Sequence, residues 1–208
     1  MDAEAIAQLF TRADGAYLFA RWGRPIAPVV FGVEESTVSI LKGAIEAVVA
    51  LAGHEIAETD AELGANLMIF FIRDWAELTE TPNLDRLIPD LGALVARLQR
   101  AGANQYRSFR FDDAGAIQAS FVFIRMDGAM ADLPAETIAL AQIVQIILLW
   151  SDTAFAGASP LAAAPGGAAV LKPEIAAVIR AGYDPVMPAS ARDASHALRL
   201  AARVGAGA

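Results

Sequence analysis

The sequence has 208 residues, of which 56% are apolar and 19% are charged, a composition that excludes an intrinsically disordered chain. The 24 carboxylates outnumber the 16 basic residues and give a net charge of −8. This balance disfavours a nucleic-acid partner, which requires clustered positive charge. The sequence contains no cysteine, which excludes thiol nucleophiles and cysteine-based zinc or redox sites.

A chain of this length can bury a core of its own. We expect a single domain over residues 1–208, with its core at residues 21–204 and an N-terminal helix at residues 2–13 that is packed on it or appended. Asp2 is a plausible N-cap for that helix. The acidic N-terminus lacks the pattern of an export signal. As written, the chain is expected to be soluble and cytoplasmic, or periplasmic if a native signal has been removed.

The first apolar segments alternate between strand and helix patterns. Residues 26–31 form an apolar strand, and Pro28 within it favours a sheet edge. Apolar residues recur at helical spacing over residues 36–52, and Gly53 occupies the usual stop position. We therefore expect an edge strand followed by an amphipathic helix.

The next segments predict a central strand and a broken helix. Residues 54–60 alternate as a short, half-polar strand would, and residues 66–72 are continuously apolar, which suits a strand covered on both faces. Residues 84–100 carry a helical apolar stripe, with a break or new start at Pro89.

A hairpin and a buried helix follow. Residues 105–111 and 116–125 are strand-like and are joined by turn residues. Residues 137–151 are uncharged, and a helix of that length spans roughly 23 Å, which is short of a hydrocarbon core of about 30 Å. The high mean hydropathy of +0.43 is therefore attributed to a buried core helix and not to a transmembrane segment.

The C-terminal part begins with an Ala/Gly/Pro-rich segment over residues 154–171, which is predicted to be a loop. A helix is expected at residues 173–181, and Ser190 with Asp193 resembles a weak capping box for a last helix. Together the segments predict an α+β fold, with a small mixed sheet, packed helices and one buried central helix.

The sequence contains few residues in the patterns typical of catalytic or metal sites. His54, Glu55 and Glu58 spell H-E-x-x-E, but on a strand this spacing would not converge on a metal ion, so a solvated strand edge is favoured. His196 stands alone among Ala and Leu and is assigned no role. Serine-hydrolase motifs and a phosphate-binding loop are absent from the sequence.

Two polar sets leave alternatives open. Three arginines on the predicted hairpin, Arg107, Arg110 and Arg125, could form a small anion site, although a solvated sheet face with ion pairs is favoured. Gln142 and Gln145, on the predicted buried helix, need hydrogen-bond partners if they are buried. They either line a cleft or bond neighbouring backbone.

Several segments resemble a bacterial family of small zincin-like proteins with a metallopeptidase pattern. The similarity involves residues 21–32, the helix ending at residues 52–53 and residues 64–72. That family also carries H-E-E-x-x-Q, then a short apolar run and Asn-Asp-Ser, and later Tyr-Asp-Pro. The matching residues here are Gln145, the apolar run 146–150, Ser151, Asp152 and Thr153, and later Tyr183, Asp184 and Pro185. The resemblance therefore extends over residues 21–204.

The departures from this family decide the functional hypothesis. In this register the His-Glu-Glu positions fall on Leu140, Ala141 and Gln142, so the metal ligand and the acid–base group are both missing. The resemblance implies a zincin-like scaffold without metal or cofactor. The candidate cleft residues are Gln142, Gln145, Asp152 and Tyr183.

We therefore expect a non-catalytic, zincin-like pseudoenzyme that acts as a binding or structural module for an unknown protein or small molecule. One alternative is a peptidase-like hydrolase with a carboxylate-based site, for example Glu136 and Asp152. Another is an oligomerisation or envelope module that docks a partner through residues 154–171. The sequence does not indicate an oligomeric state.

Overall fold

The computed structural model describes residues 1–206 and has a four-stranded sheet at its centre. The spatial order of the strands is β2, β3, β5, β4. β2, β3 and β5 are parallel, whereas the outer strand β4 is antiparallel to β5. The mixed sheet and its helices confirm the predicted α+β class. The strands are β2 (Pro28–Phe31), β3 (Leu67–Ile72), β4 (Gln105–Phe111) and β5 (Ile117–Arg125).

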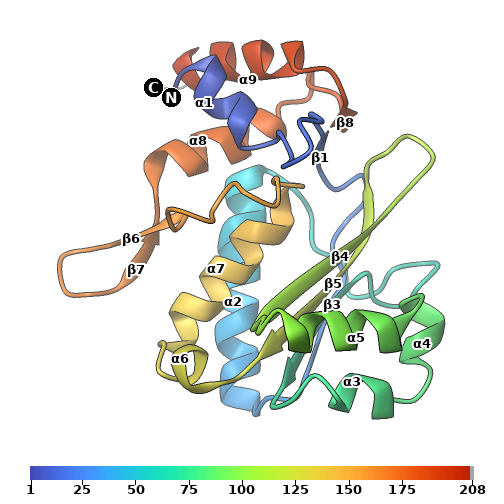
Figure 1. Cartoon of the computed structure of the whole chain (residues 1–208). Helices are drawn as coiled ribbons and strands as arrows, with labels where there is room; N and C mark the ends of the chain where they lie inside the picture. Colours follow the sequence, from blue (N-terminus) through green and yellow to red (C-terminus); the bar gives the residue numbers. More distant parts are fainter. Residues whose placement is uncertain (207–208) are drawn as a thin grey trace.

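Helices cover both faces of the sheet (Figure 1). The long helices α2 (Glu35–Ala52) and α7 (Ala135–Ile147) pack against each other on one face. α5 (Leu91–Arg100) lies on the opposite face with two short helices, α3 (Glu77–Glu80) and α4 (Leu84–Leu87). The sheet therefore separates two apolar clusters.

β3 shows why a continuous apolar run becomes a central strand. Leu67 and Ile69 pack into the cluster that contains α2 and α7, whereas Phe70 and Ile72 pack into the cluster that contains α5. Successive side chains of a strand point to opposite faces, so an apolar residue is needed at nearly every position. The predicted central position of this strand is confirmed.

The two ends of the chain lie together at one end of the sheet (Figure 1). α1 (Ala3–Gln8) packs on α9 (Ser195–Ala206), which also contacts α8 (Pro173–Gly182). Ile6 and Phe10 are fully buried, so the N-terminal helix is packed rather than appended. Within residues 1–206, no helix is both long enough and apolar enough to cross a bilayer. The remaining elements are β1 (Phe19–Ala20), α6 (Gly128–Ala131), β6 (Leu161–Ala163), β7 (Ala169–Leu171) and β8 (Ser190–Ala191).

Local sequence signals set several boundaries as predicted. The Asp2 carboxylate accepts a hydrogen bond of 2.8 Å from the backbone N–H of Ala5, as an N-cap does. Gly53 ends α2 in the left-handed conformation, with φ of 64°. Pro28 begins the edge strand β2, where its missing N–H leaves no gap in the sheet interior. The break at Pro89 separates α4 from α5.

Three expectations are wrong. Residues 54–60 form no strand and make two isolated bridges, one between Ile26 and Ile56 and one between Asp60 and Gly64. The predicted loop at residues 154–171 contains the β6–β7 hairpin, which projects from the body in Figure 1. Ser190 lies in β8 and caps no helix, whereas the Asp193 carboxylate accepts a hydrogen bond from the N–H of Ser195 at the start of α9. The bridge at Ile56 and the strand β8 depend on partners that are distant in sequence, so periodicity does not reveal them.

The buried helix α7 ends four residues earlier than residues 137–151 predict. Leu148 turns into extended backbone and forms a bridge with Arg21. The N–H of Leu149 then donates to the carbonyl of Ala20 at 2.8 Å. Apolar letters continue through this switch, because both conformations are buried and therefore look alike in sequence.

Side chains bind the carbonyl groups that the end of α7 leaves free. The last four carbonyls of a helix lack partners within the helix, and leaving such a group unpaired in a core is costly. Here three indole or phenol groups from different parts of the chain donate to them. The bonds are Trp150 Nε1 to Val144 O (2.8 Å), Trp22 Nε1 to Ile146 O (2.9 Å) and Tyr183 Oη to Ile147 O (2.9 Å).

Candidate functional site

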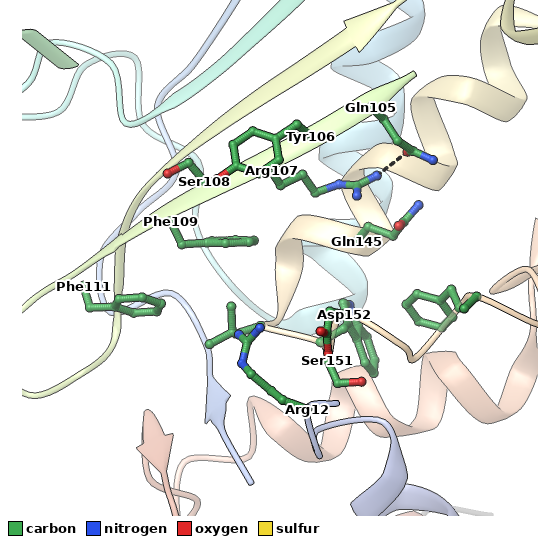
Figure 2. A pocket seen from close by; sticks show the side chains of 14 residues that line it. Arg12, Gln105, Tyr106, Arg107, Ser108, Phe109, Phe111, Gln145, Ser151 and Asp152 are labelled. Atoms are coloured by element: carbon green, nitrogen blue, oxygen red, sulfur yellow. Dashed lines mark hydrogen bonds between the residues drawn. The ribbon is translucent and has the colours of Figure 1, made fainter. Parts of the chain in front are cut away.

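A pocket of about 630 Å³ lies beside β4, and its opposite wall is formed by the end of α7 and residues 149–156 (Figure 2). Residues 105–109 and 111 of β4 line this pocket, and the side chains of the odd-numbered residues lie on its side of the sheet because side chains alternate along a strand. Arg12 and Arg107 enter from opposite sides (Figure 2). The pocket therefore combines segments from the N-terminus, the middle and the last third of the chain.

Arg107 is the most unusual side chain in this pocket. One terminal nitrogen, Nη2, donates to the amide oxygens of Gln105 at 2.6 Å and Gln142 at 2.8 Å. Its Nε is buried and has no hydrogen-bond partner within residues 1–206. Burial lowers the pKa of Arg107 to about 10, so the guanidinium still carries its charge at neutral pH. Both hydrogen-bond partners of this half-buried positive charge are neutral oxygens.

The two glutamines of α7 differ in environment. Gln142 is 2% exposed, and its Nε2 donates to the Gln105 amide oxygen at 3.0 Å, so it supports Arg107 from behind the pocket wall. Gln145 lines the pocket, and its Nε2 donates to the carbonyl of Ala141 at 3.1 Å. Gln145 therefore meets both expectations, because it lines the cleft and bonds neighbouring backbone. Gln142 instead orients Arg107.

The other two candidate cleft residues are separated by the fold. Asp152 is exposed on the pocket wall, and its carboxylate accepts a hydrogen bond of 3.2 Å from the N–H of Ala13. Tyr183 does not line the pocket and instead binds the end of α7. Burial raises the pKa of its phenol, although contact with the N–H of Trp22 and the charge of Arg21 oppose this shift. Tyr183 is therefore placed as a structural group and not as a cleft residue.

Aromatic side chains complete the pocket. The rings of Trp150 and Phe155 meet edge to face, with centroids 5.2 Å apart, and both line the wall opposite β4. Phe109 and Phe111 on β4 are stacked, with centroids 6.5 Å apart, and line the same cavity. A ligand in this pocket would meet apolar surface next to the arginines.

The other two hairpin arginines are engaged elsewhere. A terminal nitrogen of Arg110 donates to the carbonyl of Leu87, and its guanidinium lies over the ring of Phe121 at 5.3 Å on the α5 side of the sheet. Arg125 forms an ion pair of 2.6 Å with Asp127. The expected solvated face with ion pairs fits Arg125, but it does not describe Arg107.

The structure places both histidines away from the pocket. His54 Nε2 lies 2.8 Å from the carbonyl of Arg24, and burial lowers the pKa of the ring. His196, which was assigned no role, is 4% exposed, and its Nδ1 lies 2.8 Å from Tyr17 Oη. Within residues 1–206, no three His, Cys, Asp or Glu side chains gather as metal ligands would.

The carboxylates named for a hydrolytic site lie at opposite ends of α7. Glu136 is exposed in the first turn of the helix, whereas Asp152 follows its last turn and is also exposed. A paired acid and base would need to reach the same reacting atoms. The geometry of these two residues lends no support to that mechanism.

Sequence reasoning missed Arg12 and Gln105 and underrated Arg107. The alternation of β4 places Gln105, Arg107 and Phe109 on one face, and this signal was present in the predicted strand. No signal in the sequence places Arg12 opposite them.

No protein-family model, no curated protein and no solved structure matches the chain. The zincin-like resemblance therefore stays a prediction.

Proposed function

We propose that the chain is a non-catalytic binding module whose pocket beside β4 takes a partner with a carboxylate or similar anion next to an apolar group. The observation that carries this proposal is Arg107, a charged side chain with a buried, unpaired Nε and two neutral oxygen partners. An arginine prefers a bidentate carboxylate, which neither glutamine supplies.

The energetics of burial support an anionic ligand. A charge held away from water is unfavourable unless an opposite charge and hydrogen bonds compensate for it. Arg107 makes no ion pair within residues 1–206. A ligand carboxylate could accept from the terminal nitrogens of Arg107, of which Nη1 makes no hydrogen bond within residues 1–206, and Trp150, Phe155 and Phe109 would cover its apolar part.

The same residues support loss of a metal site on a zincin-like scaffold. In the register of that family, Gln142 occupies a position of the missing His-Glu-Glu set. Its amide oxygen accepts from Arg107 at 2.8 Å, so in that register a positively charged side chain contacts one of the three positions. We include the zincin-like relationship in the proposal on this basis.

Calorimetry with a matched pair of small probes tests the proposal. Phenylacetate carries a carboxylate beside a ring, and phenylacetamide has the same shape without the charge. We expect saturable binding of phenylacetate and binding of phenylacetamide that is weaker by about tenfold or more, since a charged hydrogen bond contributes roughly 1.5 to 3 kcal/mol. Arg107→Gln should reduce phenylacetate binding to the level of the amide.

Tyr183→Phe is the matched control, because Tyr183 is buried near α7 but outside the pocket. It should leave phenylacetate binding unchanged. Equal binding of the two probes, or full binding by Arg107→Gln, would refute the proposed site. One tightly held zinc ion per purified chain would contradict the metal-free part of the proposal.

A further inference from the structure

The outer edge of β4 is unpaired along its length. β4 is the end strand of the sheet, and the N–H of Arg125 in β5 donates to the carbonyl of Asn104 at 2.8 Å. In an antiparallel pair, inward and outward hydrogen-bonding residues alternate. Gln105, Arg107 and Phe109 therefore direct their N–H and C=O groups outward, and within residues 1–206 these groups bind no other atom.

Two hollows flank this edge. The pocket described above lies on the α7 side, and a second hollow of about 330 Å³ lies on the α5 side. Tyr106 and Ser108, which alternate with the outward-bonding residues, line the second hollow with Leu94. A strand added to β4 would send alternate side chains into one hollow and then the other, as peptides bound by strand addition do.

The charges around the edge are complementary to an acidic strand. The two hollows together present four arginines, and Asp152 is the one carboxylate among the described residues that line them. This concentration of positive charge occurs on a chain whose net charge is −8. A second copy of the chain would bring its own arginines to the same edge, which is repulsive. The arginines are Arg12 and Arg107 on the α7 side and Arg97 and Arg100 on the α5 side.

We propose that the β4 edge binds an extended acidic segment of another protein as a fifth strand of the sheet. Backbone groups of Gln105, Arg107 and Phe109 pair with the segment, and its carboxylates meet the arginines of the two hollows. This inference rests on the proposed function, because Arg107 supplies an anion contact in both. The register shift between residues 110 and 111 of β4 limits the pairing to the first six residues of the strand.

A capped ten-residue peptide in which pairs of glutamates alternate with pairs of valines is the probe, because this order sends glutamates to both faces of the added strand. We expect it to bind the full chain, and we expect a peptide with lysine in place of glutamate not to bind. Two further peptides carry backbone N-methyl groups on one or the other set of alternate residues. One of them should bind more weakly by about tenfold or more, because methylation removes the N–H groups that face β4, while its counterpart keeps them.

Hydrogen exchange identifies the binding mode. The amides of Gln105, Arg107 and Phe109 should exchange quickly in the free chain and become protected with the peptide, while Tyr106 and Ser108, already bonded to β5, serve as the internal reference. Binding that leaves the three amides unprotected, or equal binding of the lysine peptide, would overturn the inference. If these three amides are protected without peptide, and their protection rises with protein concentration, the edge binds a second copy of the chain instead.

The phenylacetate titration separates the two proposals. Specific binding of phenylacetate without peptide binding would overturn the strand-addition inference and leave the proposed function standing. Failure of both probes would refute both.

Discussion

The guanidinium of Arg107 lies between Gln105 and Gln142, two residues that cannot neutralise it. Such a group is easier to explain as part of a binding surface than as a contribution to stability, since replacing a buried charge by an apolar side chain is often neutral. We expect Arg107→Met to change the free energy of unfolding by less than about 1 kcal/mol, because relief of charge burial offsets the lost hydrogen bonds. Urea unfolding of the ligand-free protein measures this change, and a loss of several kcal/mol would show that Arg107 is structural.

His196 gives the protein a sensitivity to acid. The ring lies against Phe19, with centroids 4.3 Å apart, and near Tyr17. Burial, followed by the charge of Arg199, lowers its pKa to about 4. The unfolded chain, with histidine near pKa 6.5, then binds the proton first, so stability is full above about pH 6.5 and falls as the pH drops toward about 4.

We expect the free energy of unfolding to decrease by roughly 1 kcal/mol between about pH 7 and about pH 5. This value is smaller than the full pKa shift of His196 would give, because nearby solvent screens the charge. His196→Asn retains a polar group near Tyr17 and should remove most of this decrease. His54, whose pKa is also lowered, accounts for the remainder. Urea titrations at the two pH values provide the measurement, and an unchanged slope in His196→Asn would refute this assignment.

At the scale of elements, the end of α7 depends on side chains rather than on its own sequence. Tyr183 donates to the carbonyl of Ile147, so Tyr183→Phe leaves that buried carbonyl unpaired. We expect a loss of about 1 to 3 kcal/mol in unfolding free energy with no effect on the pocket. Urea unfolding together with phenylacetate calorimetry checks both parts, and a change in binding alone would return Tyr183 to the site.

The turn after β2 depends on a glycine for two reasons. Gly32 has φ of +82°, and a Cβ there would lie 2.0 Å from the carbonyl oxygen of Phe71. Gly15 has a similar φ of +87°, but a Cβ there would meet open space. Gly32→Ala should therefore cost about 3 kcal/mol or more, and Gly15→Ala about 1 to 2 kcal/mol. Equal losses in denaturant unfolding would show that the close approach to Phe71 is unimportant.

In the whole molecule, elements set by neighbouring residues were predictable from the sequence, whereas contacts between distant segments were not. The edge strand at Pro28, the central strand β3, the helix α2 and the β4–β5 hairpin follow from periodicity and turn residues. The end of α7 was not predictable, because the Trp22, Trp150 and Tyr183 donors come from distant segments.

The candidate site shows the same limit. Gln142, Gln145 and Asp152 were named from the sequence, and in the structure Gln145 and Asp152 line the pocket, whereas Gln142 is buried behind its wall and contacts Arg107. Tyr183 was also named, but it lies elsewhere, and Arg12 was missed. The pocket combines elements that are far apart in the sequence, so spacing along the chain can place residues on one face of a strand or helix but does not show which faces meet.

The most direct test of the account is the Nε–H signal of Arg107 in nitrogen-15-labelled protein during a titration with phenylacetate. We predict that this signal shifts saturably, because a carboxylate that binds the terminal nitrogens changes the electronic environment of the adjacent Nε–H. An Arg107 signal that stays in place while the protein binds phenylacetate would locate the ligand elsewhere and contradict the proposed site.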